Sequence, residues 1–229
     1  MGPHGANRGG SCASHAWATA ESKDRTTARR VFGRANAALA YDEGGVAKVK
    51  GVVVLNVRAF VIAREGREAW ERVLAALAPE DRDVLAGAIP VGWYDMSTYE
   101  RIHRALIDTL GGGDPAIMIA LGRYAAEQDL KTIHRLFLRA ANPAYVLERA
   151  AEYWARFQDS GTWSIVREAP DRVHATLAGW GSEDEATCVR LGGYIQRLFE
   201  LVGARDVVVQ RPRCRARGDD ACVFAGAWR

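Results

Sequence analysis

The order of hydrophobic patterns predicts an α+β fold, in which an antiparallel sheet of about four strands carries helices packed on one face. Segments with helical periodicity fill the chain to about residue 157, and two strand pairs follow, separated by one further helical segment. Strands joined in pairs by short turns form antiparallel hairpins, whereas parallel strands need a long crossover. The sequence therefore predicts a run of helices, then a hairpin, a helix and a second hairpin.

The helical segments are recognised by apolar residues recurring every three to four positions. The stripes are Trp70, Val73, Leu74 and Leu77; Tyr99, Ile102, His103, Leu106 and Leu110; Leu130, Ile133, His134, Phe137, Leu138 and Ala141; Val146, Ala150, Tyr153, Trp154 and Phe157; and Cys188, Leu191, Ile195, Leu198 and Val202. Each stripe is expected to face the core.

Local signals mark the ends of these helices. Ser97 with Glu100 and Ser182 with Glu185 have the spacing of capping boxes. Asp114-Pro115 and Asn142-Pro143 combine an N-cap residue with a proline suited to the first helical turn. Gly203 is expected to end the last helix.

The strand signals lie in the C-terminal third. Residues 161–168 and 173–177 form one predicted hairpin, and residues 206–210 and 221–225 form the second. His174 alternates out of phase with Val173, Ala175 and Leu177, so its side chain is expected on the opposite face of the sheet.

Residues 1–45 are rich in Gly, Ala, Ser and Arg without sustained periodicity, and we expect a disordered leader with a short frayed helix near 27–40. An incorrectly assigned start codon is the alternative. One domain is expected over residues 46–229. Of the 31 basic and 28 acidic residues, the first 50 positions hold 8 and 4. The rest is nearly neutral, so nucleic-acid binding is not indicated.

The apolar runs are far shorter than the ~20 residues of a membrane-spanning helix, and the chain starts with small polar residues instead of a signal sequence. Four cysteines among 229 residues do not make a disulfide scaffold. We therefore expect a soluble cytoplasmic protein with reduced cysteines.

The last hairpin contains the motif Cys-x3-Gly-Asp-x2-Cys-x-Phe at Cys214, Gly218, Asp219, Cys222 and Phe224. This motif resembles the closing signature of the 4-vinyl reductase-like domain, which shares its fold with NO-signalling ligand-binding domains and Golgi-transport subunits. Further pieces resemble an uncharacterised myxobacterial paralogous family with the same fold. These pieces are residues 50–54, 66–74, 92–94, 122–125 and 198–204, and Trp228.

The resemblance implies a sheet and helices around an apolar cavity that takes a small aromatic molecule or an acyl chain. It also implies a structural zinc ion held by three cysteines and a carboxylate. Cys188, Cys214 and Cys222 fall at the cysteine positions, whereas Arg211 stands where the carboxylate is expected. Other candidate fourth ligands are Asp219, Asp220, Glu183, Asp184 and His174. Alternatively, the cysteines are small buried hydrophobic residues.

The candidate ligand-binding residues are His134, Tyr153, Trp154, Trp163 and Phe199, and Trp93 and Tyr94 are further candidates for the cavity wall. His134 would offer a polar group inside an apolar pocket. The alternative is that the aromatic residues fill the core, and that His103 and His134 are hydrogen-bonded core residues.

Three functions are compatible with this pattern. The first is a non-enzymatic sensory module that binds a hydrophobic small molecule and acts through a partner protein. The second is a dimeric interaction scaffold with a vestigial cavity. The third is a vinyl-reductase-like enzyme, but nucleotide-binding loops, metalloprotease and nucleophile-elbow motifs are missing from the sequence.

Overall fold

The computed structural model describes residues 46–131 and 142–229. The expected leader, the short helix near 27–40 and most of the stripe from Leu130 to Ala141, including His134, lie outside the described residues. Within the described residues, no helix has the length and hydropathy needed to cross a bilayer.

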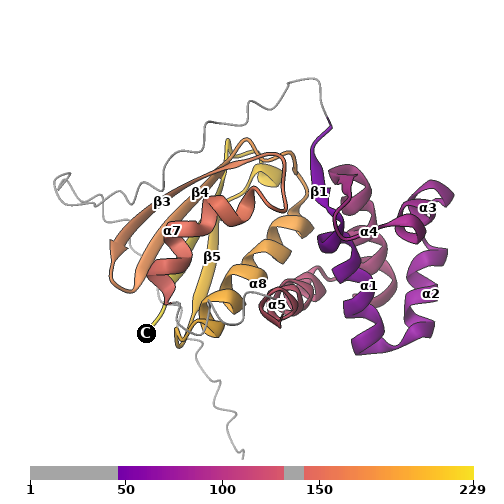
Figure 1. Ribbon diagram of the computed structural model, residues 1–229, viewed down its shortest axis with the longest axis horizontal. Helices are drawn as coiled ribbons and strands as arrows, with labels where there is room; N and C mark the ends of the chain where they lie inside the picture. Colours follow the sequence, from indigo (N-terminus) through magenta and orange to yellow (C-terminus); the bar gives the residue numbers. More distant parts are fainter. Residues whose placement is uncertain (1–45, 132–141) are drawn as a thin grey trace, which may run out of the picture.

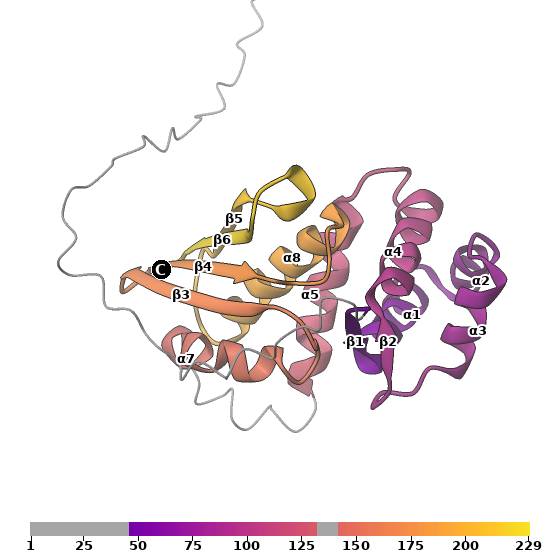
Figure 2. The ribbon, with the colours of Figure 1, turned by 90° about the horizontal axis from the view of Figure 1, so that it is seen from above.

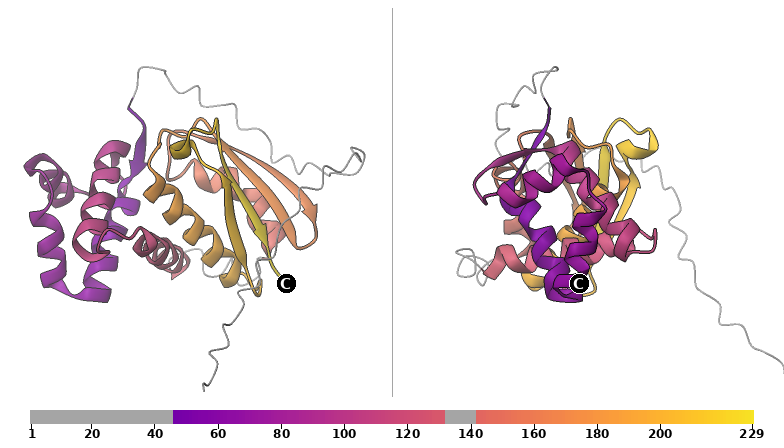
Figure 3. Two further views of the ribbon diagram at one scale, coloured as in Figure 1. Left: turned by 180° about the vertical axis from the view of Figure 1, so that it is seen from behind. Right: turned by 90° about the vertical axis from the view of Figure 1, so that its right-hand side faces the viewer.

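The described chain forms an N-terminal group of helices and a C-terminal layer of helices and sheet, side by side (Figure 1). The N-terminal group contains α1 (Gly51–Glu65), α2 (Arg67–Ala75), α3 (Pro79–Gly87) and α4 (Met96–Leu110). The C-terminal layer contains α7 (Pro143–Trp154), β3 (Thr162–Ala169), β4 (Arg172–Ala178), α8 (Glu185–Leu201), β5 (Val208–Arg213), the 3₁₀ turn η1 (Arg215–Arg217) and β6 (Cys222–Ala227). Helix α5 (Ala116–Lys131) lies between α8 and the N-terminal helices (Figure 3).

The C-terminal sheet has the predicted construction. Its strand order is β3-β4-β6-β5, and every neighbouring pair is antiparallel. Helices α7 and α8 lie on one face of this sheet (Figure 2). The α+β prediction, with two C-terminal hairpins and helices on one face, is therefore confirmed.

The alternation of side chains in β4 is also as predicted. Val173, Ala175 and Leu177 are buried on the helix-facing side. His174 points away from them and is hydrogen-bonded through Nδ1 to Glu168 at 2.7 Å. The inner face of the sheet is thus apolar and faces α7 and α8.

A second, two-stranded sheet was not predicted. Strands β1 (Lys48–Lys50) and β2 (Trp93–Asp95) pair antiparallel, and Val49 also bridges to Gln158 after α7. Each strand has three residues, too few for a period-two pattern to be recognised. Their pairing joins the N-terminal helices to the C-terminal layer.

The helix ends were predicted correctly where an asparagine or aspartate precedes proline. Asn142 Oδ1 accepts a hydrogen bond from the backbone N–H of Tyr145, and Asp114 Oδ1 accepts one from Ala116. Gly203 has a φ of 99° just after α8, a conformation that favours glycine.

Both predicted capping boxes were wrong. The N-caps are Asp95 for α4 and Asp184 for α8. Ser182 Oγ instead donates to Glu100 Oε1 at 2.6 Å, which links the start of α8 to α4. The spacing of a capping box is therefore present here without its local hydrogen bonds.

Candidate functional site: an apolar cavity and a thiol cluster

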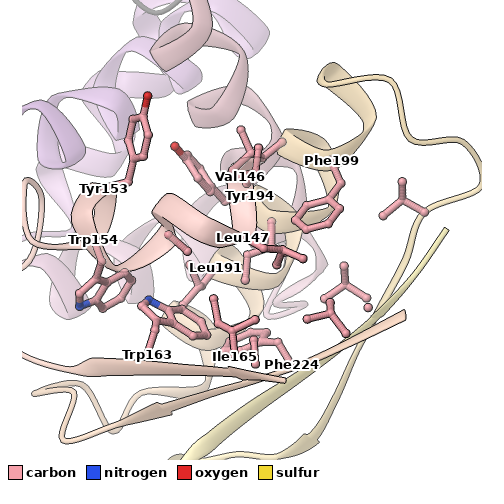
Figure 4. Close-up of a pocket in the computed structure, with 18 of the residues that line it drawn as sticks. Val146, Leu147, Tyr153, Trp154, Trp163, Ile165, Leu191, Tyr194, Phe199 and Phe224 are labelled. Carbon is pink, nitrogen blue, oxygen red and sulfur yellow. The ribbon is translucent and has the colours of Figure 1, made fainter. Parts of the chain in front are cut away.

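A cavity of about 170 Å³ lies between α7, α8 and the inner face of the sheet (Figure 4). Side chains from β3 and β6 form its floor, and side chains from α7 and α8 form its walls. Most of the lining is aliphatic or aromatic: Val146, Leu147, Ala150, Tyr153, Trp154, Trp163, Ile165, Leu191, Ile195, Leu198, Phe199 and Phe224 are among the lining residues. Such a space resembles an engineered apolar cavity of about 150 Å³ that admits benzene.

The aromatic side chains pack edge to face and form a rigid wall. Trp154 makes a T-shaped contact with Trp163, at 5.6 Å between ring centroids, and another with Trp180, at 5.3 Å. Trp154 Nε1 donates to the backbone oxygen of Ser160 at 2.7 Å, which fixes the orientation of its ring. Phe199 packs on Trp228 at the other end of the cavity. The ring faces are therefore held in place by contacts outside the cavity.

The end of the cavity away from the sheet is polar. The hydroxyl groups of Tyr153 and Tyr194 point toward this end (Figure 4). Tyr194 donates to Asp129 Oδ2 at 2.9 Å, and Asp129 and Arg190 also line the cavity. Burial, together with the nearby Asp129 carboxylate, holds the pKa of Tyr194 well above its ordinary value, so this hydroxyl is neutral.

The polar end depends on a close crossing of α5 and α8. A Cβ atom on Gly122 of α5 would lie 2.0 Å from the backbone oxygen of Arg190, and one on Gly193 of α8 would lie 2.5 Å from the oxygen of Ile119. Only glycine allows two backbones to approach so closely. This contact fixes Arg190 and Tyr194 relative to Asp129.

The polar end continues toward α4 through buried groups. His103 is fully buried, and its Nδ1 lies 3.1 Å from Thr187 Oγ1. The His103 ring packs on Tyr99, with 4.0 Å between centroids. Burial, and secondly the charge of Arg190, hold the pKa of His103 well below its ordinary value. His103 is thus a neutral, hydrogen-bonded core residue, the alternative favoured by its position on an apolar stripe.

The second candidate site is a cluster of the three predicted cysteines. The sulfur atoms of Cys188, Cys214 and Cys222 all lie within 4.8 Å of one another, and all three residues are buried. Cys188 is the fourth residue of α8, whereas Cys214 and Cys222 flank the turn between β5 and β6. The turn requires Gly218, whose φ of 89° lies in the left-handed region. Long-range packing thus brings together thiols 34 residues apart.

Hydrogen bonds favour a thiolate within the cluster. Cys188 and Cys222 are 3.4 Å apart, sulfur to sulfur, and the backbone N–H of Arg215 donates to Cys222 Sγ at 3.5 Å. These two hydrogen bonds, the one from Cys188 being the stronger influence, lower the pKa of Cys222 to about 6. The same contact with Cys222, together with burial, raises the pKa of Cys188. A thiolate with two neighbouring sulfurs is a suitable donor set for Zn²⁺.

The proposed fourth ligands have other partners. Asp219 Oδ2 accepts from the backbone N–H of Cys214 at 2.7 Å, and Asp220 pairs with Arg213. Glu183 pairs with Arg215, and Asp184 accepts from the backbone N–H and the hydroxyl of Thr187. Among the described residues, the metal-ligating cluster therefore consists of the three cysteines, which leaves the fourth position to water or another donor.

Arg211, which occupies the position expected for a carboxylate, lies along α8. Its Cδ is the nearest atom to an added Cβ on Gly192, at 3.6 Å, and its guanidinium is 3.8 Å from Glu185. The side chain is thus directed along the helix surface toward an acidic partner. Arginine has no acceptor atom and cannot replace the carboxylate as a metal ligand.

The structure places four of the five predicted ligand-binding residues, namely Tyr153, Trp154, Trp163 and Phe199, in the wall of one cavity. Trp93 and Tyr94 do not line it. Trp93 is 40% exposed beneath the ammonium group of Lys50, and the Tyr94 hydroxyl accepts from the backbone N–H of Ile89.

Sequence reasoning missed the polar residues of the cavity. Arg190 and Tyr194 are spaced four apart on α8, beside the predicted stripe of Leu191, Ile195 and Leu198. Their spacing placed them on one side of a helix, but a basic residue beside an apolar stripe is normally at the surface. Only the packing of α5 against α8 reveals that this side is buried.

Comparison with known proteins supports the resemblance noted for the last hairpin. Residues 173–227, from β4 to β6, match the family model of the 4-vinyl reductase domain. No curated protein matches the chain. The resemblance to a myxobacterial paralogous family stays a prediction.

Solved structures with the same fold are H-NOX proteins. A variant H-NOX protein from Shewanella oneidensis in the Fe(II) state superposes with a TM-score of 0.62 at 14% identity, covering 79% of this chain and 96% of the other. An H-NOX variant from K. algicida gives 0.60 at 12% identity, with coverages of 79% and 96%. The described architecture is thus the one shared by NO-signalling domains and the 4-vinyl reductase-like domain.

The similarity to these structures raises the question of haem, because one further solved structure with this fold concerns haem redox potential and porphyrin distortion. The described residues that line the cavity include no histidine, cysteine or methionine, three of the side chains that commonly ligate haem iron. Tyrosines are present, but Tyr194 donates its proton to Asp129. A space of about 170 Å³ suits a single ring and not a porphyrin. The described lining does not fit haem.

Proposed function

We propose that this chain is a non-enzymatic sensory module that binds a small apolar or aromatic molecule in the cavity and acts through a partner protein. The observation that carries the proposal is the cavity itself, a preformed apolar space with a rigid aromatic wall and one polar end. Pockets of this composition are the usual binding sites for small molecules. The shared fold adds support, since one S. oneidensis H-NOX structure is in the Fe(II)NO ligation state.

Ligand binding would act on α7. This helix carries Val146, Leu147 and Trp154 into the cavity wall and joins the two-stranded sheet through the bridge between Gln158 and Val49. A ligand that fills the space stabilises one packing of α7 against the β-sheet and changes the surface that a partner protein recognises.

The test is ligand binding to the full chain, with toluene as the probe, followed by tryptophan fluorescence and melting temperature. Organic extraction of the purified protein adds a search for a hydrophobic compound that co-purifies. Ala150 lines the cavity from α7, and Ala150→Leu fills part of the space. We expect the wild type to bind toluene and Ala150→Leu to lose most of that affinity.

The matched control is Ala75→Leu, which adds the same atoms at the exposed end of α2. It is expected to bind toluene like the wild type. The proposal fails if the wild type neither binds toluene nor co-purifies with a hydrophobic compound, or if Ala150→Leu binds as tightly as the wild type.

We also propose that Cys188, Cys214 and Cys222 hold a structural zinc ion. Three sulfurs with an N–H···S hydrogen bond support this, and zinc would cross-link α8 to the turn between β5 and β6. Elemental analysis of protein purified under reducing conditions tests it. One zinc per chain is expected, and metal-free protein that fails to take up zinc contradicts the proposal.

The alternative function, a dimeric interaction scaffold, has one observation in its favour. Ile89, Val91 and Trp93 are exposed apolar residues close together in the sequence, and Val46 is exposed nearby in the two-stranded region. Exposed apolar groups that gather on a surface indicate protein contacts. Light scattering tests this alternative: a dimer that Val91→Asp converts to monomer favours it, and a monomeric wild type contradicts it.

A further inference from the structure

Arg190 is a buried cation without an anionic partner among the described residues. The side chain of this α8 residue lines the cavity, and the residue is only 7% exposed. No described carboxylate lies within 4.0 Å of its guanidinium, and its Nε has no hydrogen-bond partner. Within the described structure the guanidinium makes a cation–π interaction, with Cζ 5.6 Å from the centroid of the Tyr99 ring.

This arrangement is costly unless another group compensates it. A guanidinium stays charged in proteins, and a buried charge is normally paired and hydrogen-bonded. The neighbouring hydroxyls cannot neutralise it, because burial raises the pKa of Tyr99 to about 12. Asp129 is the acidic residue in the cavity lining, and it accepts the proton of Tyr194.

Further unpartnered polar atoms lie beside Arg190. The buried Tyr99 hydroxyl and His103 Nε2 also have no hydrogen-bond partner within the described structure. The two rings are in contact with each other, and Tyr99 is the ring over which Arg190 lies. Three unsatisfied buried groups at one place point to a polar ligand atom or water at this end of the cavity.

We propose that the cavity binds a small hydrophobic monocarboxylate, with its carboxylate on Arg190 and its apolar body between the aromatic walls. A guanidinium pairs with a carboxylate through two parallel N–H···O hydrogen bonds. The body would lie against Trp163, Leu191 and Phe199, which line the same space. The inference rests on the proposed function, because it names the chemical class of the molecule that the cavity takes.

The surroundings restrict the ligand to one negative charge. The lining offers one unpaired guanidinium, and the Asp129 carboxylate at the same end repels a second anionic group. The remaining lining is apolar and gives a second carboxylate or a phosphate no hydrogen-bond donor set. A benzoate-sized molecule fits both the charge and the volume of about 170 Å³.

The test compares three probes of similar size on the full-length protein: benzoate, benzamide and toluene. Benzamide has nearly the shape of benzoate without its charge, and toluene reports on the apolar cavity alone. We expect the wild type to bind benzoate at least tenfold more tightly than benzamide. Arg190→Met, which keeps the length of the side chain, should lose this preference and still bind toluene.

Arg205→Gln is the matched control, since it removes a positive charge from an exposed position after α8. It should keep the preference for benzoate. If toluene binds but benzoate binds no better than benzamide, the inference is overturned and the cavity proposal stands. If none of the three probes binds, the cavity proposal itself fails. Should Arg190→Met not fold, the benzoate-to-benzamide ratio of the wild type decides alone.

Discussion

Helix α8 carries two sites that differ in how completely their polar groups are satisfied. On one side, Cys188 meets Cys214 and Cys222, and the three thiols bond to one another and to the backbone of the turn. On another side, Arg190 and Leu191 face a space that other side chains do not fill. A closed, internally bonded cluster indicates a structural role, whereas an open space with an unpaired charge indicates a binding site.

The two sites are two residues apart along α8, so their roles are coupled through one rigid element. The cysteine cluster connects the start of α8 to the β5–β6 turn, and the close crossing at Gly122 connects the helix to α5. Between these two attachments, the cavity walls are held at a fixed separation. The structural site therefore preorganises the binding site.

The largest effect is expected from Cys222→Ser. The substitution removes the sulfur that bonds both Cys188 and Arg215, and with it the proposed zinc ion. We expect the free energy of unfolding to fall by about 4 kcal/mol, in the range of a lost metal site. Urea denaturation and elemental analysis on the same sample measure both losses.

Val223→Ala is the control for this substitution, because Val223 is the neighbouring buried residue on β6. It should destabilise the protein but leave the zinc content unchanged. A Cys222→Ser protein that is as stable as the wild type would show that the cluster is ordinary core packing and would remove the contrast between the two sites.

Gly122→Ala is expected to cost about 3 kcal/mol, because the new methyl group meets the backbone oxygen of Arg190. It should also weaken toluene binding, since α8 moves relative to the wall of the cavity. Thermal unfolding and the fluorescence titration measure the two effects.

Gly87→Ala is the contrasting substitution, because an added Cβ on Gly87 at the exposed end of α3 meets nothing within 4 Å. It should stabilise the helix by about 0.5 kcal/mol. Equal effects of the two glycine substitutions would mean that the crossing of α5 and α8 does not position the cavity.

The part of the fold that was predictable is the part governed by local patterns. Alternation in β4 and the helical stripe through Leu191 fixed which faces are buried, and the sheet and its covering helices followed. The two three-residue strands did not follow, because their pairing joins segments more than 40 residues apart. Short strands depend on tertiary contacts that a period-two pattern cannot reveal.

The same limit applies to the two sites. The aromatic residues and the cysteines were recognisable from residue type and motif, as Trp163 and Cys222 illustrate. Arg190 was not, because nothing in a sequence distinguishes a buried unpaired arginine from one at the surface. The capping boxes failed for a related reason: Ser182 and Glu100 found each other across the fold instead of their local partners.

Acidification should act on the polar end of the cavity. His103 is neutral in the folded protein with a pKa well below 6.5, whereas in the unfolded chain it protonates near 6.5. The unfolded state then binds more protons, so stability is lost as the pH falls below about 6.5, by up to about 1.4 kcal/mol per pH unit. Urea midpoints between pH 7.5 and 5 measure the slope.

His103→Gln should flatten this slope, because glutamine keeps a polar group opposite Thr187 but does not titrate. His174→Gln is the control, since His174 is on the exposed face of β4. A slope that is unchanged in His103→Gln would place the acid sensitivity elsewhere in the molecule.

The smallest effect is expected from Asp219→Ala and decides how the cysteine cluster is completed. Asp219 Oδ2 accepts the backbone N–H of Cys214, so the substitution should cost about 1 kcal/mol and leave any bound zinc in place. Asp220→Ala, at an exposed position paired with Arg213, should cost less than half of that. Elemental analysis separates the two roles of Asp219. If zinc is lost with Asp219→Ala but kept with Asp220→Ala, the carboxylate moves onto the metal when zinc binds, and the cluster is not closed by its cysteines alone.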